Sequence, residues 1–197
     1  MNRLNANVTK LLKLALDADN DLYCAGLSWY ASAHDYAVIL ANQHGYTIEQ
    51  ASAVIAALSP QTGWEPNKYC ADRVMHLHSQ GLPVSQSDSG QTQANTSKAL
   101  RILDGEDVKT VLAANLPKSG HKVWSFFNNI LNPVNDRGVT VDRHAIKAWM
   151  TDETWSCITP KRYAQIERDY QDVATSLGIL PHQAQAIIWC VVRGTAD

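Results

Sequence analysis

Apolar positions recur every three or four residues along most of the chain, which is the spacing of an amphipathic helix. The clearest case is the segment 48–58, whose inward positions would be Ile48, Ala51, Val54, Ile55 and Leu58. Thr47 and Gln50 have the spacing of a capping box at its start, and Pro60 follows its end. The pattern therefore predicts a helix that begins after Thr47 and stops before Pro60.

Other segments have the same periodicity and recognisable ends. Residues 1–20 and 123–131 each form an amphipathic pattern, and 181–192 form a last helix that Gly194 closes. The segment 159–178 starts with Thr-Pro and ends in Gly, which are typical helix boundaries. Its inward positions would be Tyr163, Ile166, Tyr170, Val173 and Leu177. Because no segment shows a sustained period of two, we predict an all-α fold.

The segment 79–98 departs from this pattern. It is rich in Ser, Gln, Gly and Thr and has no apolar face, which predicts an exposed loop over about 79–95 between two groups of helices. One group, lobe A, would combine about 1–78 with 155–197, and the other, lobe B, would cover about 96–150. At 197 residues the chain is expected to be one domain built from two helical lobes.

The charge distribution limits the kind of partner that the chain can bind. Its net charge of −2 argues against capture of nucleic acid by overall charge. Residues 116–147, however, carry five Lys or Arg and two Asp or Glu, a net of +3, whereas residues 1–60 carry three and five, a net of −2. One basic segment on a mildly acidic body predicts a small contact surface for an anionic partner.

The cysteines and the apolar runs exclude several other classes of protein. Cys24, Cys70, Cys157 and Cys190 are far apart and form no C-x-x-C pair, which argues against a zinc ribbon or an iron–sulfur cluster. We expect no metal and no cofactor. The apolar runs are too short to span a membrane, and the N-terminus lacks a signal-peptide cleavage site. We therefore expect a cytoplasmic monomer with no membrane partner.

Two short segments combine turn residues with ionisable side chains. Residues 115–124 (NLPKSGHKVW) place a Pro-x-x-Gly turn before a helix, whose first N–H groups, together with Lys118 and Lys122, could seat a phosphate. Residues 139–145 (VTVDRHA) place Asp142 after a short apolar segment and at the start of a helix. From the residues alone, a plain turn and a plain N-cap aspartate remain open alternatives.

Taken together, these segments resemble the helix-hairpin-helix DNA glycosylase superfamily, of the endonuclease III and 8-oxoguanine glycosylase type. That family's hairpin reads Leu-Pro-Gly-x-Gly-x-Lys and is followed by Val-Asp-x-His. The matching residues here are Leu116, Pro117, Gly120 and Lys122, then Val141, Asp142 and His144. Lys118 replaces the first glycine of the hairpin, and the cysteine cluster of some members is absent.

The resemblance extends upstream and to one branch of the superfamily. Residues 54–62 (VIAALSPQT) resemble the family's apolar helix that ends in Leu-Ser-x-Gln-x-Thr/Ala. Together the three motifs span about residues 47–147. The segment 139–145 (VTVDRHA) also resembles a phage- and plasmid-associated branch that has been linked to modified bases in viral DNA.

The resemblance implies an enzyme that flips a modified or damaged base out of double-stranded DNA and excises it, leaving an abasic site. Asp142 would stabilise the positive charge that develops on the sugar. Lys122 would either attack the sugar as a neutral amine, with strand cleavage as a further activity, or bind phosphate.

The remaining candidates form two groups. Tryptophans would stack the extruded base, although core packing is the alternative for each: Trp29, Trp64, Trp124 and Trp189. Gln61 would fill the gap that the base leaves. The full set of expected DNA contacts is Gln61, Thr62, Pro117, Lys118, Ser119, Gly120, His121, Arg143 and His144.

The resemblance leaves the substrate open. The long polar segment and the phage-branch likeness favour a bulky modified pyrimidine, such as glucosylated hydroxymethylcytosine, and a role in anti-phage defence or in base excision repair. Two alternatives are a non-catalytic helix-hairpin-helix DNA-binding module and an enzyme that remodels bases in phage DNA hypermodification.

Overall fold

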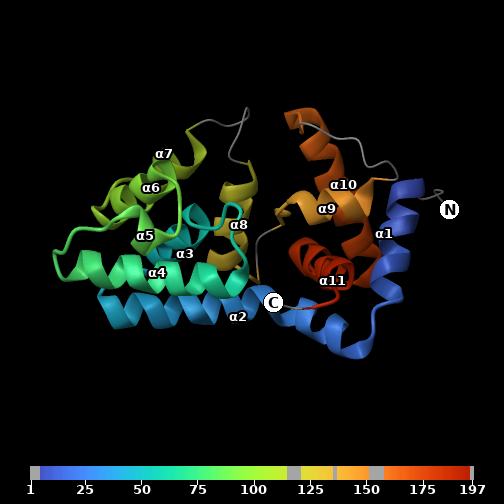
Figure 1. Cartoon of the computed structure of the whole chain (residues 1–197). Coiled ribbons are helices and arrows are strands. Elements are labelled where there is room, and N and C mark those ends of the chain that lie inside the picture. The colour runs from blue at the N-terminus through green and yellow to red at the C-terminus, as the bar shows by residue number, and fades with distance from the viewer. Residues whose placement is uncertain (1–4, 115–120, 135–136, 151–157, 196–197) are drawn as a thin grey trace.

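The computed structural model describes residues 5–114, 121–134, 137–150 and 158–195. These residues form eleven helices and no strand, which confirms the predicted all-α fold (Figure 1). The helices are α1 (Ala6–Leu16), α2 (Asn20–His44), α3 (Ile48–Ala57), α4 (Trp64–Ser79), α5 (Gln86–Ser89), α6 (Gln93–Leu103), α7 (Val108–Ala113), α8 (His121–Leu131), α9 (Arg143–Trp149), α10 (Pro160–Leu177) and α11 (Pro181–Arg193). Within the described ranges no helix has both the length and the apolar character needed to cross a membrane.

The helix ends follow the local signals in the sequence. At the start of α3, the backbone N–H of Gln50 donates to Thr47 Oγ1, and the backbone N–H of Thr47 donates to Gln50 Oε1, both at 3.1 Å. This is the predicted capping box. α10 and α11 end at Gly178 and Gly194, whose φ angles of 70° and 72° favour glycine.

Most of the segment 79–95 is exposed, as predicted, but the prediction that it is a continuous loop is wrong. α4 extends to the start of this segment, α5 forms within it, and α6 begins before it ends. Ser85 and Thr92 cap α5 and α6 with their side chains. The buried hydroxyl groups of Ser89 and Thr96 are hydrogen-bonded to each other at 2.6 Å. This polar segment therefore packs through paired hydroxyl groups rather than through an apolar face.

The buried apolar residues form two clusters. The first cluster combines the C-terminal part of α2 with α3, α4, α6, α7 and α8. The second cluster combines α1, residues 139–149, α10 and α11. The division differs from the predicted lobe boundaries, because α3 packs against α6 and α8 and so joins residues 48–79 to residues 93–131.

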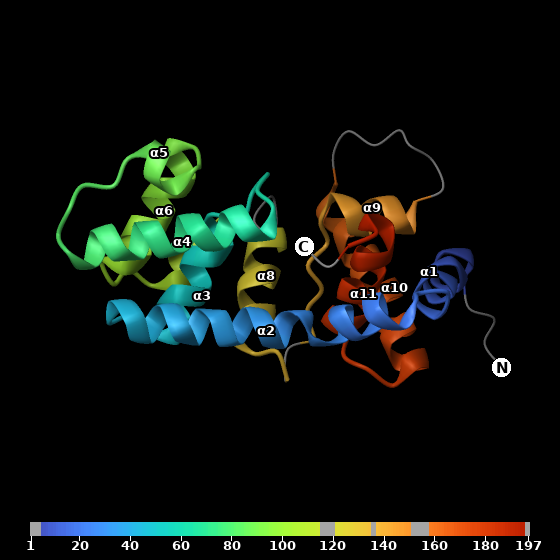
Figure 2. The ribbon, with the colours of Figure 1, turned by 60° about the horizontal axis from the view of Figure 1, so that its bottom comes forward.

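α2 runs along both clusters and holds them side by side (Figure 2). Its close partner is α11. At the contact, a Cβ atom on Gly26 would lie 2.4 Å from the Cα atom of Ile187. Only glycine permits this approach of the two helices. The approach fixes where α11 stands beside α2.

Candidate functional site

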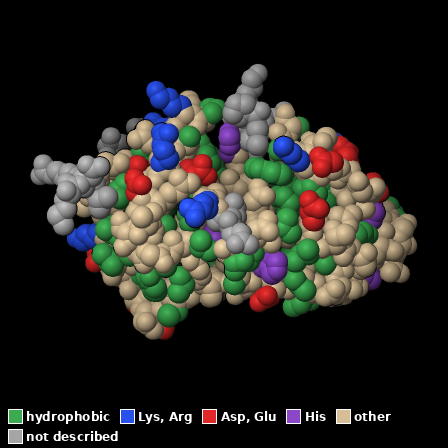
Figure 3. Space-filling model, turned by 180° about the vertical axis from the view of Figure 1, so that it is seen from behind, with side chains coloured by type: hydrophobic (Ala, Val, Ile, Leu, Met, Phe, Trp, Pro, Cys, Tyr) green, Lys and Arg blue, Asp and Glu red, His purple; other side chains and the backbone are tan. Residues whose placement is uncertain are grey.

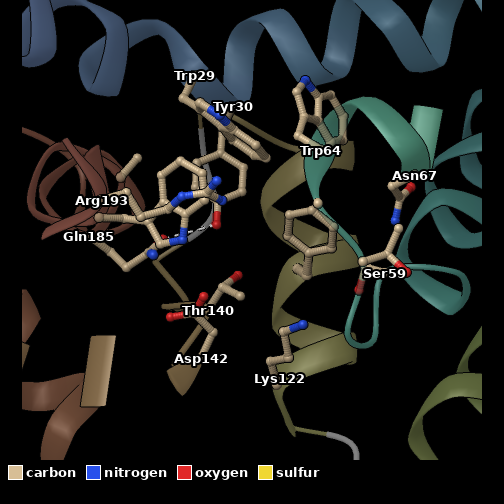
Figure 4. Close-up of a pocket in the computed structure, with 15 residues that line it drawn as sticks. Trp29, Tyr30, Ser59, Trp64, Asn67, Lys122, Thr140, Asp142, Gln185 and Arg193 are labelled. Carbon is tan, nitrogen blue, oxygen red and sulfur yellow. Dashed lines mark hydrogen bonds between the residues drawn. The ribbon is translucent and has the colours of Figure 1, made fainter. Parts of the chain in front are cut away.

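A pocket lies between the two clusters and beneath α2 (Figure 4). The empty space within it is about 580 Å³, a figure that includes open solvent at its mouth. The walls come from α2, the turn between α3 and α4, α4, α8, the segment before α9, and α11.

Aromatic rings form a large part of the pocket wall. Three of the four predicted tryptophans line it, namely Trp29, Trp64 and Trp189. The ring centroid of Trp29 lies 4.9 Å from that of Trp64 and 6.1 Å from that of Trp189. Tyr30 and Phe126 add two further rings. A flat heterocycle entering this space would find aromatic faces to stack on.

Trp124 does not line the pocket, contrary to the prediction for the base pocket. It packs against the first cluster, with its ring centroid 5.3 Å from that of Phe127. The reason is the helical period. Phe126 lies four residues after Lys122 and shares its face of α8, whereas Trp124 lies two residues after Lys122 and points away from it.

Asp142 lines the pocket and also caps α9. The backbone N–H of Ala145 donates to Asp142 Oδ1 at 2.8 Å. Asp142 Oδ2 accepts no hydrogen bond from the part of the chain that the structure describes. The plain alternative, an N-cap aspartate, is thus observed, but one carboxylate oxygen remains available for a ligand.

The segment before Asp142 is tied to both of its neighbours. The Tyr163 hydroxyl donates to the carbonyl of Val139 at 2.8 Å and accepts from the backbone N–H of Val141 at 3.2 Å. On the other side, the Thr140 hydroxyl donates to Asn129 Oδ1 at 2.9 Å. Burial raises the pKa of Tyr163 to about 12, so this hydroxyl keeps its proton. Asp142 therefore stands at the end of a backbone that α8 and α10 hold in place.

Lys122 lies in the first turn of α8 and lines the pocket on the side opposite Asp142 (Figure 4). Its ammonium group makes no hydrogen bond or ion pair with any described residue. Burial lowers the pKa of Lys122, the nearby Asp142 opposes this shift, and Arg143 adds to it. The neutral amine is consequently easier to reach than for a lysine in water.

Gln61 and Thr62 lie in the turn between α3 and α4. Gln61 is exposed and has a φ of 60°, a left-handed conformation that costs a non-glycine residue energy. Thr62 lines the pocket, and Gln91 Nε2 donates both to its hydroxyl and, at 3.1 Å, to the carbonyl of Pro60. The segment that was expected to be a free loop thus holds this turn through Gln91.

The predicted DNA contacts around α8 and α9 differ in their surroundings. The ring of His121 stacks on Tyr163, with centroids 4.9 Å apart, and so faces the Asp142 segment. Arg143 is exposed, and its Nε donates to His144 Nε2 at 3.2 Å. Burial lowers the pKa of His144, against the effect of Asp142. The hairpin residues Pro117, Lys118, Ser119 and Gly120 lie outside the described residues.

Several pocket residues were not predicted from the sequence. The Tyr30 hydroxyl donates to Gln185 Oε1 at 3.0 Å, across 155 residues of sequence. Thr140, Phe126 and Arg193 also line the pocket. Gln185 is only 4% exposed. The available signal was a glutamine within the apolar run of the last helix, at a position that faces inward.

On the face opposite to that of Figure 1, acidic and basic side chains are mixed (Figure 3). Among the described residues, no group of three or more His, Cys, Asp or Glu side chains could hold a metal ion. The chemistry that the described residues offer at this pocket is that of aromatic faces, one carboxylate, one half-buried amine and one guanidinium group.

The chain belongs to a family of unknown function (DUF7178), whose family model matches residues 2–196. No curated protein and no solved structure matches the chain. The pocket geometry must therefore carry any functional conclusion.

Proposed function

We propose that this protein is a DNA glycosylase that flips a modified base into the pocket and excises it, leaving an abasic site. The observation that carries the proposal is that Lys122 and Asp142, which belong to different helix groups, both line one aromatic pocket. In this proposal the two groups are the two lobes of a helix-hairpin-helix glycosylase. Residues 117–120, which lie outside the described residues, and the first turn of α9 would contact the DNA backbone.

The aromatic wall supports the base-binding step. Trp29, Trp64 and Trp189 would stack against the extruded base, and Gln61 would fill the gap left in the duplex. Our preferred substrate is a modified pyrimidine such as glucosylated hydroxymethylcytosine, and the associated role is defence against phage.

Asp142 would act on the sugar. As the bond between C1′ and the base breaks, its electron pair leaves with the base, and positive charge develops on C1′ and the ring oxygen. A carboxylate fixed next to that charge lowers the barrier without having to reorganise. The hydrogen bonds that tie residues 139–141 to α8 and α10 support this role.

Lys122 would supply the nucleophile. Its neutral Nζ forms a bond to C1′ while the base departs with the electron pair and takes up a proton from water, and Asp142 accepts the proton that Nζ loses. The C1′–O4′ bond then breaks and O4′ takes up a proton, which opens the sugar ring and gives the imine. Loss of a proton from C2′ then expels the 3′ phosphate and cleaves the strand. The lowered pKa of Lys122 supports this version over one in which water attacks C1′.

The test compares phage genomes that contain glucosylated hydroxymethylcytosine with unmodified genomes of the same phage. We expect abasic sites in the modified DNA alone and a covalent protein–DNA adduct after borohydride reduction. Abasic sites without an adduct would assign the nucleophile to water. Binding without abasic sites on any modified DNA would overturn the proposal in favour of a DNA-binding module. An altered base without an abasic site would instead indicate a base-remodelling enzyme.

A further inference from the structure

Three cations near His144 take no part in the bond-breaking steps proposed above. Arg143 and Lys147 lie on α9, and Arg193 lies in the last turn of α11. All three are exposed, and none forms an ion pair with a residue that the structure describes. Like charges repel one another, so a group of this kind favours an anion in its vicinity.

Contacts join the cations of the two helices through His144 and Trp189. Arg143 Nε donates to His144 Nε2 at 3.2 Å, and the ring centroid of His144 lies 6.2 Å from that of Trp189. The guanidinium carbon of Arg193 lies 4.4 Å from the centroid of Trp189. Trp189 and Arg193 both line the pocket. Arg193 is thus the one cation of the group that touches an aromatic wall residue.

The lowered pKa of His144 is consistent with an anion site formed by arginine side chains. Burial and the neighbouring cations Arg143, Arg193 and Lys147 lower the pKa of His144, against the opposing effect of Asp142. A neutral ring can accept the hydrogen bond from Arg143 and can donate from Nδ1. Arginine presents several donors in one plane, which suits the oxygens of a phosphate.

We propose that Arg143 and Arg193, on either side of His144, form a seat for one backbone phosphate at the mouth of the pocket, and that Arg193 thereby positions Trp189. The inference rests on the proposed function in naming DNA as the source of the phosphate. It assigns a role to Arg193, which no motif in the sequence identified. It also means that the residue that binds the backbone phosphate positions a ring that stacks on the base.

The test measures the affinity for a duplex with a single tetrahydrofuran site, an abasic analogue that cannot be excised. Binding is titrated over a series of salt concentrations for the wild type and for Arg193→Gln, Arg143→Gln and Lys13→Gln. Lys13 is the matched control, because it is an exposed cation on α1, at the outer edge of the molecule (Figure 1). We expect each arginine variant to reduce the slope of log affinity against log salt by no more than about 1, because both arginines contact the same phosphate. Lys13→Gln should leave the slope unchanged.

A second pair of variants tests the coupling to Trp189. Arg193→Lys keeps the charge but loses the planar guanidinium that lies on the indole ring. We expect it to retain the salt slope of the wild type and to bind more weakly. We also expect Arg193→Gln and Trp189→Phe together to cost less than the sum of their separate effects. Additive losses of affinity would show that Arg193 does not position Trp189.

The outcomes separate this inference from the proposed function. A wild type that excises no base but shows the expected slopes would keep the phosphate seat and reject the glycosylase. An active glycosylase with an unchanged slope in Arg193→Gln would reject the phosphate seat alone. A wild type that does not bind the duplex would reject both. Thermal melting followed by circular dichroism verifies that each variant is folded.

Discussion

The two sides of the pocket are built differently. On the side of the second cluster, Asp142 ends a backbone segment that α8 and α10 hold by hydrogen bonds, and its Oδ1 is occupied in capping α9. On the side of the first cluster, Lys122 has no bonding partner among the described residues, and Gln61 is exposed on a strained left-handed backbone. The Asp142 side is held by hydrogen bonds, whereas the Lys122 side presents side chains that can form new contacts.

This difference matches the tasks that the proposal gives to the two sides. A group that stabilises developing charge works best when it need not move. A nucleophile and a wedge, in contrast, must form new contacts during the reaction, so existing bonds would have to be broken first. The following variants test whether the contrast is functional, beginning with the largest expected effect.

Asp142→Asn should reduce base excision by about 10²–10³-fold. Asparagine is as good an N-cap as aspartate, so α9 and the fold should persist. The measurement is the single-turnover excision rate on modified DNA, with binding to the tetrahydrofuran duplex as the control. Wild-type excision by Asp142→Asn would mean that capping α9 is the only role of this residue.

Lys122→Gln should abolish the borohydride-trapped adduct while leaving DNA binding in place. In the wild type, trapping should become faster as the pH rises, because only the neutral amine attacks and its fraction grows with pH. Burial lowers the pKa of Lys122, so the rise should occur below the pH at which an ordinary lysine titrates. Trapping rates between about pH 6 and about pH 9 test this. An adduct that forms equally well in Lys122→Gln would exclude Lys122 as the nucleophile and leave it the role of a phosphate contact.

Tyr163→Phe should loosen the fixed side. The buried carbonyl of Val139 and N–H of Val141 would lose their partner, at a cost of about 1–3 kcal/mol. For a chain of this length the melting temperature should fall by about 2–4 °C per kcal/mol. Excision should fall by less than in Asp142→Asn. Tyr23→Phe is the matched control, since that hydroxyl makes no hydrogen bond with the described residues. Equal melting temperatures for the two variants would mean that Tyr163 does not anchor the segment.

On the Lys122 side, Gln61→Gly should lower activity without lowering stability. Glycine adopts the left-handed backbone at Gln61 without strain, so stability should be unchanged or rise by about 1 kcal/mol. Excision should nevertheless decrease a few-fold, because the wedge is lost. Gln61→Ala keeps the strain and also loses the wedge. If both variants excise the base at the wild-type rate, Gln61 is only a turn residue.

The helices with explicit end signals could be predicted from the sequence. The capping residues around Thr47 and the glycines at 178 and 194 mark helix ends through local chemistry, and the structure has helices at those positions. The segment 79–95 was mispredicted because its buried positions are polar. The hydroxyl groups of Ser89 and Thr96 are hydrogen-bonded to each other. A search for apolar periodicity cannot detect such a polar pair.

The pocket could be predicted only in part. Lys122 and Asp142 lie in recognisable motifs, and both line it. Gln185 and Tyr30 meet across 155 residues, and no local pattern encodes that contact. Trp124 shows the opposite error. Its residue type fits a base pocket, but its phase on α8 turns it toward the first cluster.

Gly26 has a consequence for how the protein tolerates mutation. A single methyl group there would meet the backbone of Ile187, and α11 would have to move away from α2. Gln185, Trp189 and Arg193 lie on α11 and would move with it. The dimensions of the pocket are therefore set by a residue that does not line it. Substitutions of pocket side chains could therefore change substrate preference only within the distance between α2 and α11, which the glycine at position 26 sets.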